Sequence, residues 1–213
     1  MLLAEAFFLV AHEDTSGRPR LHSRAVGLGL GSALLAELLL SGHVTWSDGR
    51  VVAHRMAHQR PPGDVLLHVV VDRIVAEPAQ PLRTWLAALA ADAVGQVAVH
   101  LTRGGVIRVV GPGRWRRPVR YLPIDSQVAA GPQVRLNWLL IHRQTMTWSD
   151  VALAGLCQAT GLMPDLVWTD HRMPALAYLA EHLAHARRVL PALVELLEHT
   201  EAAVGDAVLT HHS

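Results

Sequence analysis

The sequence contains no lysine, although it has 19 basic residues, all of them arginine. Arginine differs from lysine in presenting a planar fork that binds phosphate and carboxylate groups through two hydrogen bonds. Recognition of anions is therefore one interpretation of this bias. Codon usage in a GC-rich genome, such as that of an actinobacterium, is the simpler one, because alanine, leucine, valine and glycine are also abundant.

Cysteine is nearly absent as well, since Cys157 is the only one in the chain. An internal disulfide is excluded, which favours a cytoplasmic protein. Cys157 lies in an apolar segment, so we expect a buried thiol rather than a nucleophile. No apolar run approaches the ~18 residues that a membrane span needs, and the N-terminus lacks the basic start of a secretory signal. Membrane contact is therefore expected to be peripheral, at the inner face of the membrane.

Charged residues are also few, at 17%, whereas 51% of the 213 residues are hydrophobic. Such a chain can bury a large core, and we expect a single domain over residues 1–213. A half with helices and hairpins is expected at about 1–124, a helical half at about 125–204, and a short polar tail after it. The formal net charge of +1 gives no general attraction to nucleic acid, so an anionic partner would have to meet a local basic patch.

The order of apolar and turn residues predicts a mainly α fold, a single-domain helical bundle decorated with two short β-hairpins. A long helix followed by a hairpin is expected twice, at 23–40 with 44–53 and at 82–101 with 106–122. A short helix at 2–11 and a brief strand at 20–22 precede them. Four more helices are expected at 127–143, 149–160, 173–186 and 189–204, and their short connections are typical of a bundle.

A rigid turn and a helix start are expected around Asp64. Two prolines and a glycine precede Asp64, which occupies an N-cap position. The apolar residues that follow at helical spacing predict one buried face, made of Leu66, Leu67, Val70, Val71 and Ile74. Taken alone, this pattern indicates only a capped core helix.

Four segments taken in order resemble a known family. They are AEAFFLVAHEDTSGRPR at 4–20, LGSALLAELLLSGHV at 30–44, PPGDVLL at 61–67 and LTRGGVI at 101–107. This series is similar to the Golgi phosphoprotein 3-like family over nearly the whole chain. The resemblance implies a non-enzymatic peripheral membrane protein that binds anionic phospholipid headgroups. Eukaryotic members bind phosphatidylinositol 4-phosphate, and the resemblance implies no cofactor and no metal.

The second hairpin is the first candidate site. Its tip carries four arginines and a tryptophan within seven residues: Arg114, Trp115, Arg116, Arg117 and Arg120. An aromatic side chain with cationic neighbours on a projecting loop suits the headgroup layer of an anionic bilayer. The resemblance implies that this hairpin reaches the membrane and takes part in homo-oligomer formation. A solvated hairpin with incidental arginines is the alternative.

A basic stretch before the helix at 23–40 is the second candidate, a headgroup site formed by Arg18, Arg20, His22 and Arg24. Guanidinium and imidazolium groups both donate hydrogen bonds to phosphate oxygens. In eukaryotic members a tryptophan and three arginines hold the phosphoinositide, and those positions fall here on His22, Gly31, Ala91 and Val94. None matches, so the headgroup of another lipid, such as cardiolipin or a different phosphatidylinositol species, is expected. A loop that is simply rich in arginine is the alternative.

Three further patterns carry weaker signals. Gly27, Gly29 and Gly31 form a GxGxG pattern without a preceding strand, so close helix packing is favoured over a dinucleotide site. Histidine pairs at helical spacing, His54/His58 and His182/His185, leave a zinc site as a minor alternative. Asp64 and the Asp170–His171 pair could act as acids or bases, but no nucleophile stands beside a base in a recognisable motif.

Two other functions stay open. Helix-then-hairpin units resemble winged helices, in which the helix enters a major groove of DNA and the hairpin contacts phosphates. The apolar segment Leu34–Leu40 lacks the polar residues that read bases, so nucleic acid is not the expected partner. The other alternative is a protein–protein interaction scaffold that binds neither lipid nor nucleic acid.

Overall fold

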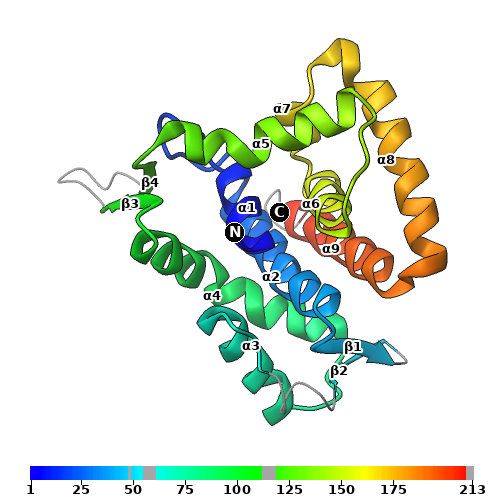
Figure 1. Cartoon of the computed structure of the whole chain (residues 1–213). Coiled ribbons are helices and arrows are strands. Elements are labelled where there is room, and N and C mark those ends of the chain that lie inside the picture. The colour runs from blue at the N-terminus through cyan, green and yellow to red at the C-terminus, as the bar shows by residue number, and fades with distance from the viewer. Residues whose placement is uncertain (48, 55–60, 112–118, 210–213) are drawn as a thin grey trace.

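A computed structural model describes residues 1–47, 49–54, 61–111 and 119–209. The elements follow in the order α1 (Leu3–Val10), α2 (Ser23–Leu40), β1 (Val44–Ser47), β2 (Arg50–Ala53), α3 (Val65–Ala76), α4 (Leu82–Arg103), β3 (Ile107–Val110), β4 (Arg120–Pro123), α5 (Ser126–Ile141), α6 (Trp148–Ala159), α7 (Met163–Leu166), α8 (Thr169–Val189) and α9 (Pro191–Leu209) (Figure 1). Each strand pair is a separate antiparallel hairpin. The mainly α fold with two hairpins is therefore confirmed.

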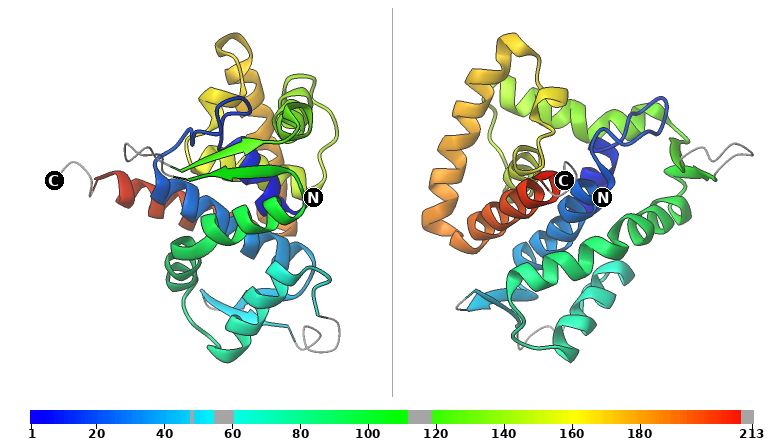
Figure 2. Two further views of the ribbon diagram at one scale, coloured as in Figure 1. Left: turned by 90° about the vertical axis from the view of Figure 1, so that its left-hand side faces the viewer. Right: turned by 180° about the vertical axis from the view of Figure 1, so that it is seen from behind.

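Helix α2 lies at the centre of the molecule, with α1, α4, α6 and α9 packed around it (Figures 1 and 2). All residues from Ala25 to Ala36 are buried. The helix begins after His22, whose ring accepts the N–H of Arg24 at 3.4 Å. It ends before Gly42, whose φ of +73° is in the left-handed region that follows many helix ends.

Two helices of the described chain, α2 and α4, are long and apolar enough to cross a bilayer when only length and composition are considered. The expectation that no segment meets this criterion was wrong. The apolar window of α2 is 78% buried in the protein, whereas that of α4 is only 39% buried. Helix α2 is thus a core helix, and α4 leaves an apolar face at the surface.

Glycines on α2 set its distance from its neighbours. A Cβ atom on Gly27 would lie 2.6 Å from the carbonyl oxygen of Ala90 on α4, and one on Gly31 would lie 3.1 Å from the nearest α4 side chain. A Cβ atom on Gly29 would overlap the ring of Phe7 on α1. The GxGxG pattern therefore serves close helix packing, as predicted.

Helix α3 has the predicted start and the predicted buried face. The Asp64 carboxylate accepts the N–H of Leu66 at 2.8 Å, which caps the helix. The five residues expected to face inward are all buried: Leu66, Leu67, Val70, Val71 and Ile74.

The loop at 11–22 attaches the β3–β4 hairpin to the body, and Figure 2 shows the two side by side. The N–H of Tyr121 in β4 donates to the carbonyl oxygen of Gly17 at 3.1 Å. Gly17 has a φ of +63°, and a Cβ atom there would lie 2.5 Å from the carbonyl carbon of Tyr121. Only glycine allows this close approach.

The brief strand predicted at 20–22 is wrong. An isolated bridge between His12 and Pro19 stands in its place, and the chain then turns directly into α2. The Arg20 N–H still donates to the carbonyl oxygen of Ala11 at 2.8 Å, but His22 caps α2 two residues later, which leaves no room for a longer ladder.

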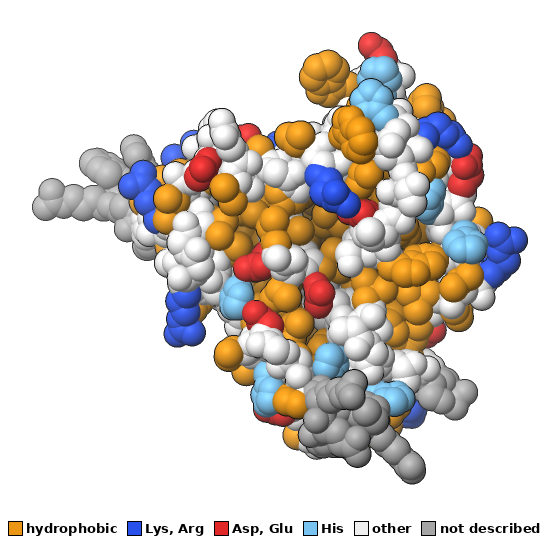
Figure 3. Space-filling model, in the orientation of Figure 1, with side chains coloured by type: hydrophobic (Ala, Val, Ile, Leu, Met, Phe, Trp, Pro, Cys, Tyr) orange, Lys and Arg blue, Asp and Glu red, His pale blue; other side chains and the backbone are white. Residues whose placement is uncertain are grey.

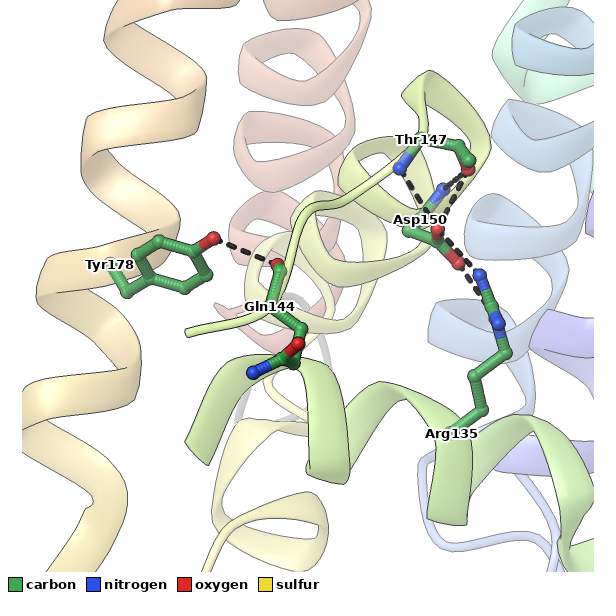
Figure 4. Close-up of polar contacts among 5 residues, drawn as sticks. All are labelled: Arg135, Gln144, Thr147, Asp150 and Tyr178. Atoms are coloured by element: carbon green, nitrogen blue, oxygen red, sulfur yellow. Dashed lines mark hydrogen bonds and ion pairs between the residues drawn. The ribbon is translucent and has the colours of Figure 1, made fainter. Parts of the chain in front are cut away.

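Polar contacts join α5, α6 and α8 in the second half (Figure 4). Arg135 donates through Nε and Nη2 to the two carboxylate oxygens of Asp150, at 3.1 Å and 2.9 Å. Asp150 also forms a capping box with Thr147, which starts α6 as predicted. Burial opposes ionisation of Asp150, but these hydrogen bonds outweigh it and keep the pKa of its carboxyl below the ordinary value. The Tyr178 hydroxyl donates to the Gln144 carbonyl at 2.8 Å and so ties α8 to the α5–α6 connection.

Two details of this half differ from the expectation. Helix α7 was not predicted, and α8 begins at Thr169 rather than at residue 173. Gly161, with a φ of +84°, ends α6, and Pro164 then lies in the first turn of α7, where a missing N–H costs nothing. Such a short helix has too little periodicity to appear in a sequence pattern.

Replacement of Gly27 by alanine should lower the free energy of unfolding by about 1–3 kcal/mol, because the new methyl group would force α2 and α4 apart. The matched control is Gly95→Ala on α4, where nothing lies within 4 Å of the added atom. That control should stabilise the protein by up to ~1 kcal/mol through helix propensity. Urea unfolding followed by circular dichroism measures both. Equal effects of the two substitutions would contradict the packing role of Gly27.

Candidate functional site

The structure brings the two predicted basic sites next to each other. Arg18 follows Gly17, and Arg120 precedes Tyr121, so the hydrogen bond between Gly17 and Tyr121 joins the loop at 11–22 to the base of the hairpin. Arg18 is exposed and Arg120 is half-buried. Of the residues predicted at the hairpin tip, Arg120 is described, whereas Arg114, Trp115, Arg116 and Arg117 lie outside the described residues.

The strand register adds Arg108 to this surface. Val110 pairs with Arg120, and Arg108 lies two residues before Val110 on the same strand. Opposed residues of a hairpin share a face, as do residues two apart, so Arg108 and Arg120 share one face. Ile107 faces the other way and is buried. We name Arg18, Arg108 and Arg120 the hairpin-base arginines.

The four residues of the predicted headgroup cluster do not form one group in the structure. Arg18, His22 and Arg24 are exposed. Arg20 is half-buried and turns toward α5, where its Nη2 lies 3.4 Å from the side-chain oxygen of Gln133. Arg24 belongs to the first turn of α2 and so lies at the edge of a separate cavity.

This cavity, which we call the α2–α4–α9 hollow, has a volume of about 470 Å³. Arg24 lines it from α2, Arg83 from the first turn of α4, and Asp206 from α9, and the remaining lining is leucine and alanine. The Arg83 guanidinium lies 3.4 Å from the Asp206 carboxylate, and both side chains are exposed, so their pairing contributes little to stability. Arg83 was not predicted as a site residue.

Of the four positions aligned with the family's ligand residues, one lines the same hollow. Ala91 lines it, and Gly31 is packed against α4 beside it. Val94 is half-buried against the core, and His22 caps α2. The cationic groups of this hollow therefore come from the starts of two helices, at Arg24 and Arg83, rather than from the aligned positions.

The other candidate groups have structural roles. His182 lies 3.1 Å from the carbonyl oxygen of Tyr178, and His185 stacks on Trp148. His58 of the other predicted pair is outside the described residues. Within the described ranges, no three His, Cys, Asp or Glu side chains are grouped to hold a metal ion. Cys157 is fully buried, and burial raises the pKa of its thiol far above the usual range, which makes it a poor nucleophile.

Comparison with protein families shows to which family this chain belongs. The family model described as Golgi phosphoprotein 3 matches residues 3–205. The chain belongs to this family. A search among curated proteins found no match. The Golgi phosphoprotein 3 match extends from α1 into α9, so both hairpins and every lining residue of the hollow except Asp206 lie inside the matched region.

His12 anchors the basic loop of this family member. Its ring is buried, stacks on Phe8 with centroids 4.2 Å apart, and meets Tyr121 edge-on at 5.2 Å. Nδ1 lies 2.7 Å from the carbonyl oxygen of Phe8. Burial lowers the pKa of His12 to about 4; the hydrogen bond to Phe8 opposes this shift, and the charge of Arg20 adds to it.

Acid should therefore weaken the fold through His12. The unfolded chain binds a proton near pH 6.5, whereas the folded protein binds it only near pH 4. The free energy of unfolding should fall by about 3 kcal/mol as the pH drops through this window, because the unfolded state gains the proton first.

Urea midpoints at pH 7.5, 5.5 and 4.5 test this, with His12→Phe as the comparison. The variant should lose less stability than the parent over the same range, since other acid-sensitive groups such as Asp150 are common to both. Parallel pH dependences would show that His12 is not responsible.

Proposed function

We propose that this protein is a non-enzymatic peripheral membrane protein that binds anionic phospholipid headgroups at the inner face of the membrane. The observation that carries the proposal is the α2–α4–α9 hollow, in which Arg24 and Arg83 are the cationic groups of a mainly apolar cavity. Membership of the Golgi phosphoprotein 3 family supports the same function. Phosphate groups suit such a site because guanidinium groups donate paired hydrogen bonds to their oxygens.

A second contact comes from the hairpin-base arginines, together with the predicted tip residues. Each arginine close to an anionic surface contributes about 1 kcal/mol. Because Arg83 is paired with Asp206, Arg24 and the three hairpin-base arginines contribute ~4 kcal/mol before ordering costs, an affinity of roughly 1 mM. Self-association through the hairpin would raise this weak affinity by avidity.

The buried state of α2 counts against a winged-helix function. This helix precedes the first hairpin, as a recognition helix would, but the core encloses it. The second such helix, α4, exposes Ala87, Ala91 and Val99 between its exposed polar residues, and these three cannot donate to or accept from base edges. Headgroup binding is thus favoured over base recognition.

Vesicle co-sedimentation tests the proposal. The parent protein should pellet with phosphatidylglycerol or cardiolipin vesicles and stay in solution with phosphatidylcholine. The double variant Arg24→Glu/Arg83→Glu should bind the anionic vesicles at least about tenfold more weakly, because two attractive charges become repulsive. A second variant with Arg114, Arg116, Arg117 and Arg120 changed to Glu measures the contribution of the hairpin.

The matched control is Arg187→Glu/Arg188→Glu on α8. It makes the same change in net charge and also breaks one exposed ion pair, between Arg187 and Glu198. This control should bind like the parent. Equal pelleting of all the variants would remove the hollow and the hairpin from the mechanism. A stable oligomer in light scattering, with no pelleting and no salt-dependent DNA shift, would instead favour the scaffold function.

A further inference from the structure

An apolar groove runs between α3 and α4, on the opposite side of α4 from its packed face. Its volume is about 340 Å³, and it is lined chiefly by Val65, Val69, Gly95, Val99 and Arg103. The three valines are 73%, 43% and 50% exposed. In Figure 3 a few hydrophobic side chains lie at the surface of the lower part of the molecule, among histidine, acidic and other polar side chains. Single exposed valines are ordinary, but a row of them along a groove marks a binding surface.

Gly95 leaves the α4 side of the groove bare. Glycine is the costliest residue after proline in a helix interior. At Gly27 a close neighbour accounts for that choice, but nothing lies within 4 Å of a Cβ atom built on Gly95. Helix packing within the described chain therefore does not require a glycine there. Its effect is to open the groove down to the α4 backbone.

The charges around the groove favour an anionic end group. Arg103 lies at one end, and no carboxylate is among the lining residues. Within the described ranges Arg103 forms no salt bridge. His100 also lines the groove, and its Nε2 lies 3.5 Å from Glu5 and 3.4 Å from Asp64, neither of which is among the lining residues.

The dimensions favour a single extended chain. Gly95 to Arg103 covers about two helical turns, or roughly 12 Å, whereas a helix with its side chains is about 10 Å across. A groove of about 340 Å³ and that length is narrow for a helix and is near the lower limit of small-ligand pockets. An extended hydrocarbon chain matches both the width and the apolar lining.

We propose that the α3–α4 groove binds one acyl chain of an anionic phospholipid, with the headgroup held at Arg103. The position supports this partner, because only residues 104–106 separate Arg103 from β3, which carries Arg108. The charged end of the groove thus adjoins the hairpin-base arginines. The inference rests on the proposed membrane function and adds a site for the lipid chain to it.

The test uses a phosphatidylglycerol carrying an environment-sensitive fluorophore on one acyl chain, kept below its micelle concentration, so that no bilayer is present. The parent protein should give a saturable rise in fluorescence. Gly95→Leu should weaken binding at least about tenfold, because the added side chain fills the groove. The variant should still fold, because leucine favours a helix more than glycine does. Arg103→Glu should weaken binding and abolish the preference for phosphatidylglycerol over the matching phosphatidylcholine probe.

Ala184→Leu on the exposed face of α8 is the control, since it adds an apolar side chain outside the groove. It should bind the probe like the parent. Circular dichroism checks folding, and Val69→Gln/Val99→Gln provides a second variant that changes the walls without filling the groove.

Unchanged probe binding in Gly95→Leu and in the valine variant would overturn the proposal. Loss of a dimer in those variants, without any probe binding by the parent, would identify the groove as a contact between copies and also overturn it. Vesicle pelleting separates this result from the proposed function: a parent that pellets but fails to bind the monomeric probe retains headgroup binding and lacks the chain site.

Discussion

The close approach of α2 to α4 is the constraint on which the rest of the structure depends. Gly27 and Gly31 remove the side chains that would separate the two helices. Because the helices lie so near each other, Arg24 and Arg83 at their starts come to line one hollow. The same packing fixes the direction of α4, whose other end carries the α3–α4 groove and leads into the second hairpin.

One backbone hydrogen bond also joins the two parts of the basic surface. The loop at 11–22 and the strand β4 are separated by about a hundred residues, and Gly17 and Tyr121 join them by one hydrogen bond. The stacked rings of Phe8 and His12 both meet the Tyr121 ring edge-on, which holds Tyr121 in place for that bond. Two basic clusters that are distant in the sequence thus become parts of one surface. The charge of this protein is small in total but locally concentrated.

Local signals in the sequence predicted most of the fold, and long-range geometry accounts for what they missed. The cap at Asp64 and the buried face of α3 were predictable because both depend on residues within a few turns. The strand at 20–22 failed because α2 begins directly after its N-cap at His22, which leaves room for a single bridge at Pro19. Short elements such as α7 lack the length for a periodic pattern.

The site was harder to predict than the fold. Arg83 was missed because its neighbours in space, Arg24 and Asp206, are about 60 and 120 residues away. Arg108 was also missed, although it lies in the predicted hairpin, because only the observed strand register places it on the face of Arg120. A site formed by residues on helices that are distant in the sequence cannot be predicted from a local pattern, whereas a site carried by one hairpin can.

Gly31 limits which side chains can lie between α2 and α4. A side chain at that position would meet α4 at once, since even a Cβ atom lies 3.1 Å from the nearest α4 side chain. A long cationic residue between the helices needs a wider interhelical spacing, and a tight pair such as this one leaves charge only at the helix starts. A long side chain at Gly31 would therefore have to move α4, and with it the hollow and the groove that α4 lines.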